Sequence, residues 1–237
     1  MADVTGRPLS TDPRLPDAVL WDMDGTLVDT EPYWISAEHA LVERFGGTWT
    51  DELAHQLVGN PLLVSADFII ANSPVTLTPH EVVHVLMGSV VDQVREHVPW
   101  RPGAAELLAE GSRLGVPAVL VTMSWQPLAR AVVDAAPPGS FAHLVTGDEV
   151  THGKPHPEPY LTAADLLAAP PERCLAIEDS PTGVRSAVAA GVPTIAVPHV
   201  VPIPDVPGAA RIRTLDGASL SELAQRARSA SSPPRES

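Results

Sequence analysis

The fold of this chain is decided by one stretch near its start, AVLWDMDGTLVDTE, which covers residues 18–31. Its first four residues form a short apolar run that is typical of a buried strand. Two carboxylates, Asp22 and Asp24, follow that run directly, and Gly25 allows the chain to turn sharply after them. The stretch therefore predicts a buried strand that ends at a pair of acidic side chains.

Four more apolar runs of this kind follow along the chain, at 118–121, 143–145, 174–177 and 194–197. Each of them comes after a helical segment, and two of those segments stop at a glycine, Gly115 and Gly191, as helices commonly do. Continuous apolar strands that alternate with helices are typical of a parallel sheet with both faces covered. We therefore expect an α/β fold built on a parallel sheet.

Residues 32–98 interrupt this alternation, because their pattern is helical throughout. Thr78 to Glu81 has the spacing of a capping box with proline at the first helical position, and it opens a long helix. We expect this segment to be a helical cap, or lid, inserted after the first strand. The predicted core then comprises 15–31 and 99–215, and we expect flexible tails at 1–14 and 228–237.

The composition narrows the class of partner. The 237 residues carry 15 basic and 29 acidic side chains, so the net charge is −14. Such an acidic surface repels nucleic acids and anionic lipid, which favours a small-molecule partner. A single cysteine excludes an intrachain disulfide, and no signal peptide or membrane-spanning run is present. We expect a cytoplasmic protein.

Polar side chains follow the predicted strands where each strand ends. Thr122 and Met123 follow the second, Lys154 comes some residues after the third, and Glu178 and Asp179 follow the fourth. The carboxyl ends of parallel strands meet at one edge of a sheet, where ligands bind. Lys154 is also the only lysine among the 15 basic residues, and a compact ammonium group differs chemically from a guanidinium group. We therefore expect these side chains to converge with Asp22 and Asp24.

This set of residues suits phosphoryl transfer. An aspartate can attack phosphorus and form an acyl-phosphate that water later opens. Asp24, two residues beyond Asp22, would serve as general acid and then as general base. The four carboxylates and the phosphate outweigh the single charge of Lys154, so we expect a hard divalent cation, Mg²⁺.

Three segments resemble the haloacid dehalogenase superfamily, and especially its β-phosphoglucomutase-like and sugar-phosphate phosphatase subgroup. They are DMDGTLVDTE at 22–31, GKPHPEPY at 153–160 and IEDSPTG at 177–183, and Thr122 matches the second motif of the family. The resemblance implies a Rossmann-like core with a helical cap after the first motif. It also implies a phosphoric monoester hydrolase that acts through an aspartyl-phosphate.

The same resemblance assigns roles to the residues. Asp22 would be the nucleophile and Asp24 the acid and base. Magnesium would be held by Asp22, the Asp24 carbonyl and Asp179, with Glu178 joining directly or through water. Thr122, the Met123 amide and Lys154 would hold the phosphate.

Several other activities of this superfamily can be weighed on the residues. The presence of Asp24 argues against a dehalogenase, and a lid without lysine excludes the usual phosphonate hydrolase mechanism. A β-phosphoglucomutase-like phosphomutase would need a histidine and two cations where Trp34, Val58 and Leu62 stand. We therefore expect a phosphatase acting on sugar or polyol phosphates. The phosphomutase is the alternative, and a catalytically inactive regulatory domain is a further one.

Overall fold

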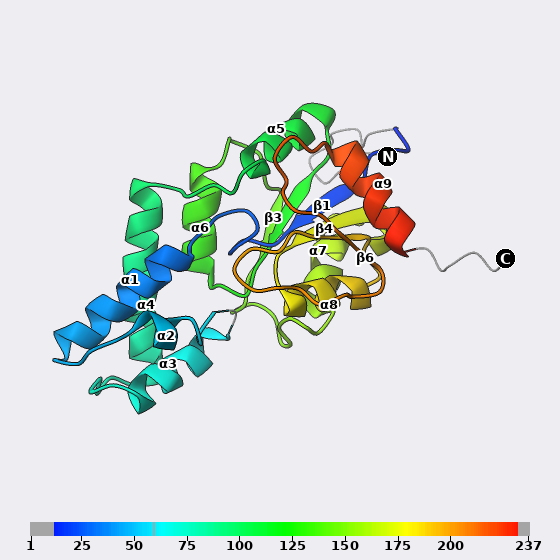
Figure 1. Cartoon of the computed structure of the whole chain (residues 1–237). Helices are drawn as coiled ribbons and strands as arrows, with labels where there is room; N and C mark the ends of the chain where they lie inside the picture. The colour runs from blue at the N-terminus through cyan, green and yellow to red at the C-terminus, as the bar shows by residue number, and fades with distance from the viewer. Residues whose placement is uncertain (1–11, 59, 232–237) are drawn as a thin grey trace.

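A six-stranded parallel sheet lies at the centre of the computed structural model of the chain, which describes residues 12–58 and 60–231 (Figure 1). The strand order is β3-β2-β1-β4-β5-β6. The strands are β1 (Ala18–Trp21), β2 (Ala118–Val121), β3 (His143–Val145), β4 (Cys174–Glu178), β5 (Thr194–Ala196) and β6 (Ala209–Arg211). All five predicted strands are therefore confirmed within one or two residues. The edge strand β6 was not predicted.

The first strand is central because it pairs with β2 on one side and with β4 on the other. Val19 is opposite Ala118 in β2 and opposite Leu175 in β4. This register brings the carboxyl ends of the three strands to one edge of the sheet. The segments that carry the predicted catalytic residues start at that edge.

The two faces of the sheet bury alternate side chains of the same strand. Val19 and Trp21 pack in one cluster, whereas Ala18 and Leu20 pack in another. The first cluster includes residues of α5 (Ala104–Leu114) and α9 (Leu220–Ser231), and the second includes residues of α7 (Glu158–Leu166) and α8 (Pro181–Ala189). The predicted α/β fold with a Rossmann-like parallel sheet is confirmed.

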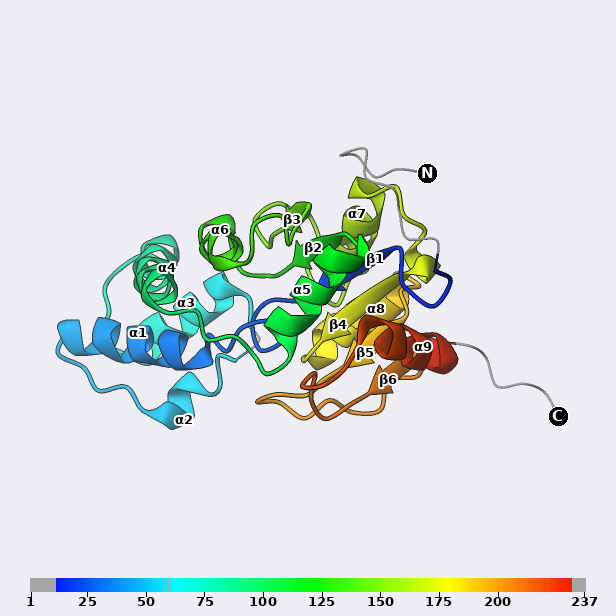
Figure 2. The same cartoon turned by 90° about the horizontal axis from the view of Figure 1, so that it is seen from above.

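Four helices stand between β1 and α5, and we call them the helical insert. They are α1 (Glu31–Arg44), α2 (Asp51–Ala54), α3 (Leu62–Ala71) and α4 (Pro79–Glu96). Figure 2 shows them grouped at one side of the sheet. Helix α4 packs against α1 and α3 and also against α6 (Gln126–Ala135) of the remaining chain. The division into a 32–98 cap and a 15–31 plus 99–215 core stays a prediction.

The start of α4 has the capping box that its sequence predicts. The Thr78 amide donates to Glu81 Oε2 at 2.8 Å, and the Glu81 amide donates to Thr78 Oγ1 at 3.4 Å. These two bonds satisfy donors that the first helical turn leaves free.

Both predicted tails lie partly outside the described residues, namely at 1–11 and at 232–237. Residues 228–231, expected to belong to the second tail, form the last turn of α9 instead. Arg228 there donates a hydrogen bond of 2.7 Å to the carbonyl of Arg14, which ties the helix to the chain before β1. Within the described residues, no helix combines the length and apolar character that crossing a membrane requires.

Candidate active site

The predicted nucleophile, Asp22, follows β1 directly and is almost fully buried. Its Oδ1 accepts a hydrogen bond of 2.7 Å from Lys154 Nζ. Its Oδ2 is buried and has no hydrogen-bond partner among the described residues. Burial and the neighbouring Glu178 raise the pKa of Asp22 to about 7, while Lys154 acts in the opposite direction. One oxygen of Asp22 is therefore held in place and the other is unpaired.

The Lys154 side chain is buried and donates to three acceptors at once. They are Asp22 Oδ1 at 2.7 Å, Glu178 Oε1 at 2.7 Å and the Val121 carbonyl at 2.8 Å. An ammonium group has three hydrogens, so all of them are used. Burial alone would lower the pKa of Lys154, but the two carboxylates more than offset this and raise it. Lys154 is therefore a permanent cation.

Glu178 and Asp179 end β4 and differ in their surroundings. Glu178 is completely buried, and its carboxylate accepts hydrogen bonds from Lys154, from the Tyr160 hydroxyl at 2.8 Å and from Ser180. Asp179 accepts a 3.3 Å bond from Thr26 Oγ1. Burial, followed by the charges of Asp22 and Glu178, raises the pKa of Asp179 well above its usual value.

Gly25 permits the close approach of the first loop to Asp179. Its φ is +86°, a left-handed conformation that favours glycine. A Cβ atom at this position would also collide with the Asp179 carboxylate. The turn after Asp24 and the position of Asp179 therefore both depend on the missing side chain.

The carboxylate of Asp24 is held by three hydroxyl groups. Its Oδ1 accepts a 2.5 Å bond from Thr30, and its Oδ2 accepts bonds of 2.8 Å from Ser124 and 3.2 Å from Thr122. Asp24 lines the same cavity as Asp22, but its carboxylate is not among the hydrogen-bond partners of Lys154. The two aspartates, two residues apart, thus have different partners, which suits separate chemical roles.

The predicted phosphate-binding residues lie beside this pair. The Thr122 hydroxyl also accepts a 3.0 Å bond from the Ser124 amide, and the Met123 sulfur lies 3.2 Å from the Lys154 amide, which donates to it. Thr122, Met123 and Lys154 line one cavity together with Asp22. The structure therefore places the predicted phosphate-binding residues beside the predicted nucleophile.

Three carboxylates of the site could hold a cation. One oxygen each from Asp22, Glu178 and Asp179 lies within 4.8 Å of the others. Burial and then the neighbouring carboxylates raise the pKa of Asp22 and Asp179, and Oδ2 of Asp22 is buried without a partner, so a bound cation would stabilise the charged forms. Hard oxygen donors are the ligands that Mg²⁺ prefers. The residues present therefore fit a magnesium ion.

The predicted site residues, all except Glu178, line a cavity of about 480 Å³, which lies within the usual size range of a small-molecule site. The insert contributes several of its walls. Its lining residues there are Glu31, Trp34, Glu38, Leu57, Val58, Asn60, Leu62, Ser65, Val83 and Leu86. Arg185 of α8 and His199, which follows β5, also line the cavity.

The sequence matches one established family of hydrolases. The family model of haloacid dehalogenase-like hydrolases matches residues 16–191, well over half of the sequence. The chain belongs to the haloacid dehalogenase-like hydrolase family.

Within this family the chain is similar to phosphatases of phosphorylated carbohydrates. It is 33% identical to hexitol phosphatase A of Escherichia coli over 75% of this chain and 81% of that one. It is 29% identical to the phosphorylated carbohydrates phosphatase of Thermotoga maritima, over 76% and 83% of the two chains. The predicted family and the predicted enzyme class, a phosphoric monoester hydrolase, are confirmed at this level.

A solved structure of the family gives the same fold. The crystal structure of CbbY from Rhodobacter sphaeroides in complex with phosphate matches with a TM-score of 0.78 and 28% identity. The match covers 88% of this chain and 99% of that one. The likeness therefore spans the insert as well as the sheet.

The sequence did not predict some residues of this haloacid dehalogenase-like site. Ser124 and Tyr160 contact Asp24 and Glu178, and Arg185 lines the cavity. Ser124 lies two residues beyond Thr122 in the same strand-end loop, so its position offered a signal. Tyr160 and Arg185 lie inside helices, and the sequence pattern does not show which helix face meets the site.

Proposed function

We propose that this protein is a magnesium-dependent phosphatase that hydrolyses sugar or polyol monophosphates through an aspartyl-phosphate. The observation that carries the proposal is the unpaired Oδ2 of Asp22, in a cavity that also holds Lys154, Asp24 and Thr122. A buried carboxylate oxygen with no partner, beside a permanent cation, is suited to attack an electrophile that carries negative charge.

The reaction has two steps. Asp22 Oδ2 forms a bond to phosphorus while the bond to the ester oxygen breaks, and Asp24 gives that oxygen its proton. Water then attacks the phosphorus of the acyl-phosphate, Asp24 takes a proton from the water, and Asp22 leaves as a carboxylate. Inorganic phosphate and the free alcohol are the products. Thr122 and the Met123 amide hold the phosphate oxygens, and Lys154 offsets their negative charge from its position beside Asp22.

Asp22, Asp179 and the Asp24 carbonyl would hold the magnesium ion, with Glu178 behind them. The ion supplies positive charge that offsets repulsion between the carboxylates and the phosphate. Both oxygens of Glu178 already accept hydrogen bonds within the protein. We therefore propose that Glu178 acts through water or by positioning Lys154.

The residues of the insert favour a phosphatase over a phosphomutase. Trp34, Val58 and Leu62 line the cavity, and none of them carries a positive charge that would hold a second phosphate. The names of the related hexitol and carbohydrate phosphatases support the same substrate class. An inactive regulatory domain is not supported, because the complete catalytic set is present.

We also propose that residues 32–98 form a lid over this cavity, since Leu57, Val58 and Leu86 of that segment line it. Closure of such a segment commonly excludes water from the reacting groups. X-ray scattering should detect compaction when a phosphate mimic and magnesium are added together.

A panel of phosphate esters at constant magnesium tests the function. Wild-type protein should release phosphate from hexose and hexitol monophosphates, and Asp22→Asn should release none. Phosphate release by Asp22→Asn at the wild-type rate would contradict the proposal.

A further inference from the structure

Two carboxylates of the insert line the catalytic cavity, and neither belongs to the predicted catalytic set. Glu31 and Glu38 both lie on α1, and Trp34 lies between them. Spacings of three and four residues place all three on the same face of the helix. Glu38 lies seven residues after Glu31, which corresponds to about 10 Å along the helix axis. The cavity therefore has an acidic stripe along α1.

Glu38 is the more unusual of the two because it is only 5% exposed. Its Oε2 accepts a 3.1 Å hydrogen bond from Trp49 Nε1. Among the described residues no other hydrogen bond or ion pair reaches this carboxylate. A buried carboxylate without a cationic partner is destabilising. A side chain that costs stability and lines the catalytic cavity is a candidate for function rather than for folding.

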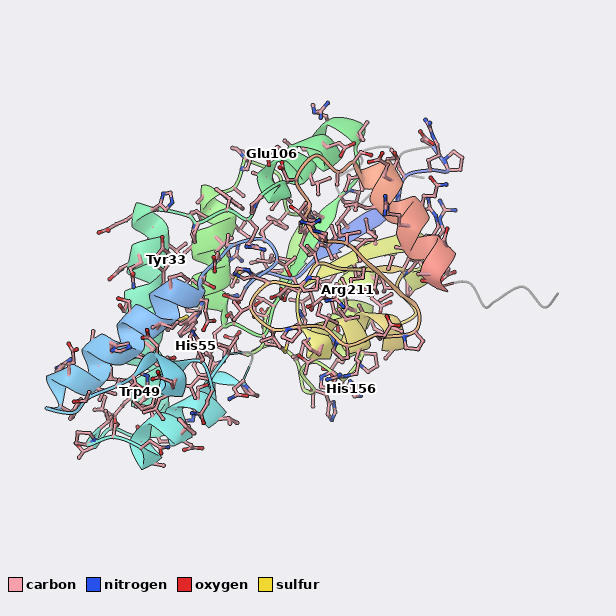
Figure 3. The ribbon with its side chains drawn as sticks, in the orientation of Figure 1. Tyr33, Trp49, His55, Glu106, His156 and Arg211 are labelled. Atoms are coloured by element: carbon pink, nitrogen blue, oxygen red, sulfur yellow. The ribbon has the colours of Figure 1, made fainter. Side chains whose placement is uncertain are left out.

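Trp49 holds Glu38 in a defined position. It belongs to the connection between α1 and α2, it lies among the helices of the insert (Figure 3), and it is buried. Its ring meets the ring of Phe68 of α3 edge to face, with centroids 6.2 Å apart. The indole is therefore anchored by packing, and its N–H group occupies one oxygen of Glu38. The other oxygen, Oε1, has no partner among the described residues.

The surroundings of Glu38 define what it can bind. A carboxylate only accepts hydrogen bonds, so its partner must be a donor. The insert side of the cavity is mostly apolar, with Leu57, Val58, Leu62, Val83 and Leu86 beside the uncharged polar residues Asn60 and Ser65. Beside α1, a second phosphate would be repelled by Glu31 and Glu38, whereas the cation Arg185 lines the cavity from another element, α8. A neutral hydroxyl group is a donor that meets these conditions.

We propose that Glu38, held by Trp49, is a specificity-determining residue that accepts hydrogen bonds from the hydroxyl groups of an uncharged, polyhydroxylated leaving group. The inference rests on the proposed phosphatase function and adds the residue that selects the alcohol. It requires a leaving group long enough to reach along α1 from the catalytic aspartates.

Two esters, assayed at pH 8 so that Glu38 is ionised, separate this role from catalysis. They are sorbitol 6-phosphate and 4-nitrophenyl phosphate, whose leaving group carries no further hydroxyl. Glu38→Ala should lower kcat/KM for sorbitol 6-phosphate roughly 10- to 100-fold, the range for a lost hydrogen bond to a charged group. Turnover of 4-nitrophenyl phosphate should change less than about threefold. The matched control is Glu43→Ala, at an exposed position of the same helix, which should change neither.

Glu38→Gln decides the case if Glu38→Ala folds poorly, because the amide oxygen keeps an acceptor for Trp49. It should lower kcat/KM for sorbitol 6-phosphate alone, by roughly 3- to 10-fold, since a neutral acceptor bonds more weakly. Its melting temperature should not fall below that of the wild type. Equal losses on both esters, or no loss on either, would overturn the inference. A wild-type protein that hydrolyses neither ester would overturn the proposed function itself.

Discussion

The ammonium group of Lys154 lies 2.7 Å from Oδ1 of Asp22, and the same ammonium group lies 2.7 Å from Glu178. Lys154 is thus held by hydrogen bonds to side chains of the protein, while the second oxygen of Asp22 has no partner among the described residues. This arrangement positions the proposed nucleophile and balances part of its charge.

Replacing Lys154 with methionine should lower kcat/KM by roughly 10²- to 10³-fold, because the site loses the cation that offsets its carboxylates. Lys154→Arg should not restore activity, since a planar guanidinium group does not fit a site built for three converging hydrogen bonds. Steady-state kinetics below the melting temperature of each variant measures both effects. Arg113→Met, an exposed position on α5, serves as control. Activity of Lys154→Met within threefold of wild type would contradict this role.

Asp22→Asn and Asp24→Asn should fail in different ways. An amide at position 22 cannot attack phosphorus, so no phosphoenzyme should form. An amide at position 24 cannot transfer the proton, and turnover should fall by about 10²- to 10⁴-fold. Mass spectrometry of the intact protein after rapid quenching distinguishes the two variants. A phosphoenzyme in Asp22→Asn would place the nucleophile elsewhere.

Removal of divalent cations should abolish turnover, because Asp22, Glu178 and Asp179 cluster around a single lysine. Excess EDTA should stop phosphate release, and added Mg²⁺ should restore it. Mg²⁺ should also raise the melting temperature of the wild-type protein, as a ligand of the folded state does. Asp179→Asn should weaken that thermal response. Full activity in excess chelator would rule out a required cation.

Glu38 should make the stability of the protein depend on pH. Burial raises the pKa of Glu38 to about 7 from an ordinary value of 4.5, although the Trp49 bond acts the other way. The folded state therefore binds this proton more tightly, so stability falls as pH rises from about 4.5 to about 7. Glu38→Gln should gain stability relative to wild type over that window, by up to about 3 kcal/mol.

Urea unfolding at pH 5 and at pH 8 measures the effect. Glu43→Gln, exposed on the same helix, should show no such pH-dependent difference. The contrary result is that the free energies of unfolding of Glu38→Gln and wild type differ by the same amount at both pH values. That result would show that folding does not raise the pKa of Glu38.

The enzyme should show no useful phosphomutase activity, because Trp34, Val58 and Leu62 offer no cation to hold a second phosphate. With β-glucose 1-phosphate and a trace of the 1,6-bisphosphate, free phosphate should be the product. Coupled detection of glucose 6-phosphate alongside free phosphate gives both rates. Glucose 6-phosphate appearing faster than free phosphate would promote the phosphomutase alternative.

Arg185 shows the limit of counting charges along a sequence. Trp34, Val58 and Leu62 carry no positive charge, and the sequence therefore favoured a phosphatase of sugar or polyol phosphates. Arg185 reaches the same cavity from α8, outside the insert. Whether the positive charge of Arg185 reaches the cavity depends on which face of α8 meets it, and the sequence pattern does not indicate that face. The acidic residues Glu31 and Glu38 of the insert were missed for the same reason.

The sequence by itself determined the α/β fold, five of the six strands, the capping box of α4 and the convergence of the residues from Asp22 to Asp179, whose catalytic roles stay a prediction. These features are local: apolar runs, glycine stops and strand-end motifs report on a few consecutive residues, and parallel topology then brings the strand ends together.

The tertiary structure alone decided that β6, a short edge strand of Ala-Ala-Arg, pairs with β5. It alone decided that Trp49 meets Glu38 and that Ser124 meets Asp24 across 100 residues. The physical reason is that such contacts depend on how helices and loops pack in space, which short-range periodicity does not encode.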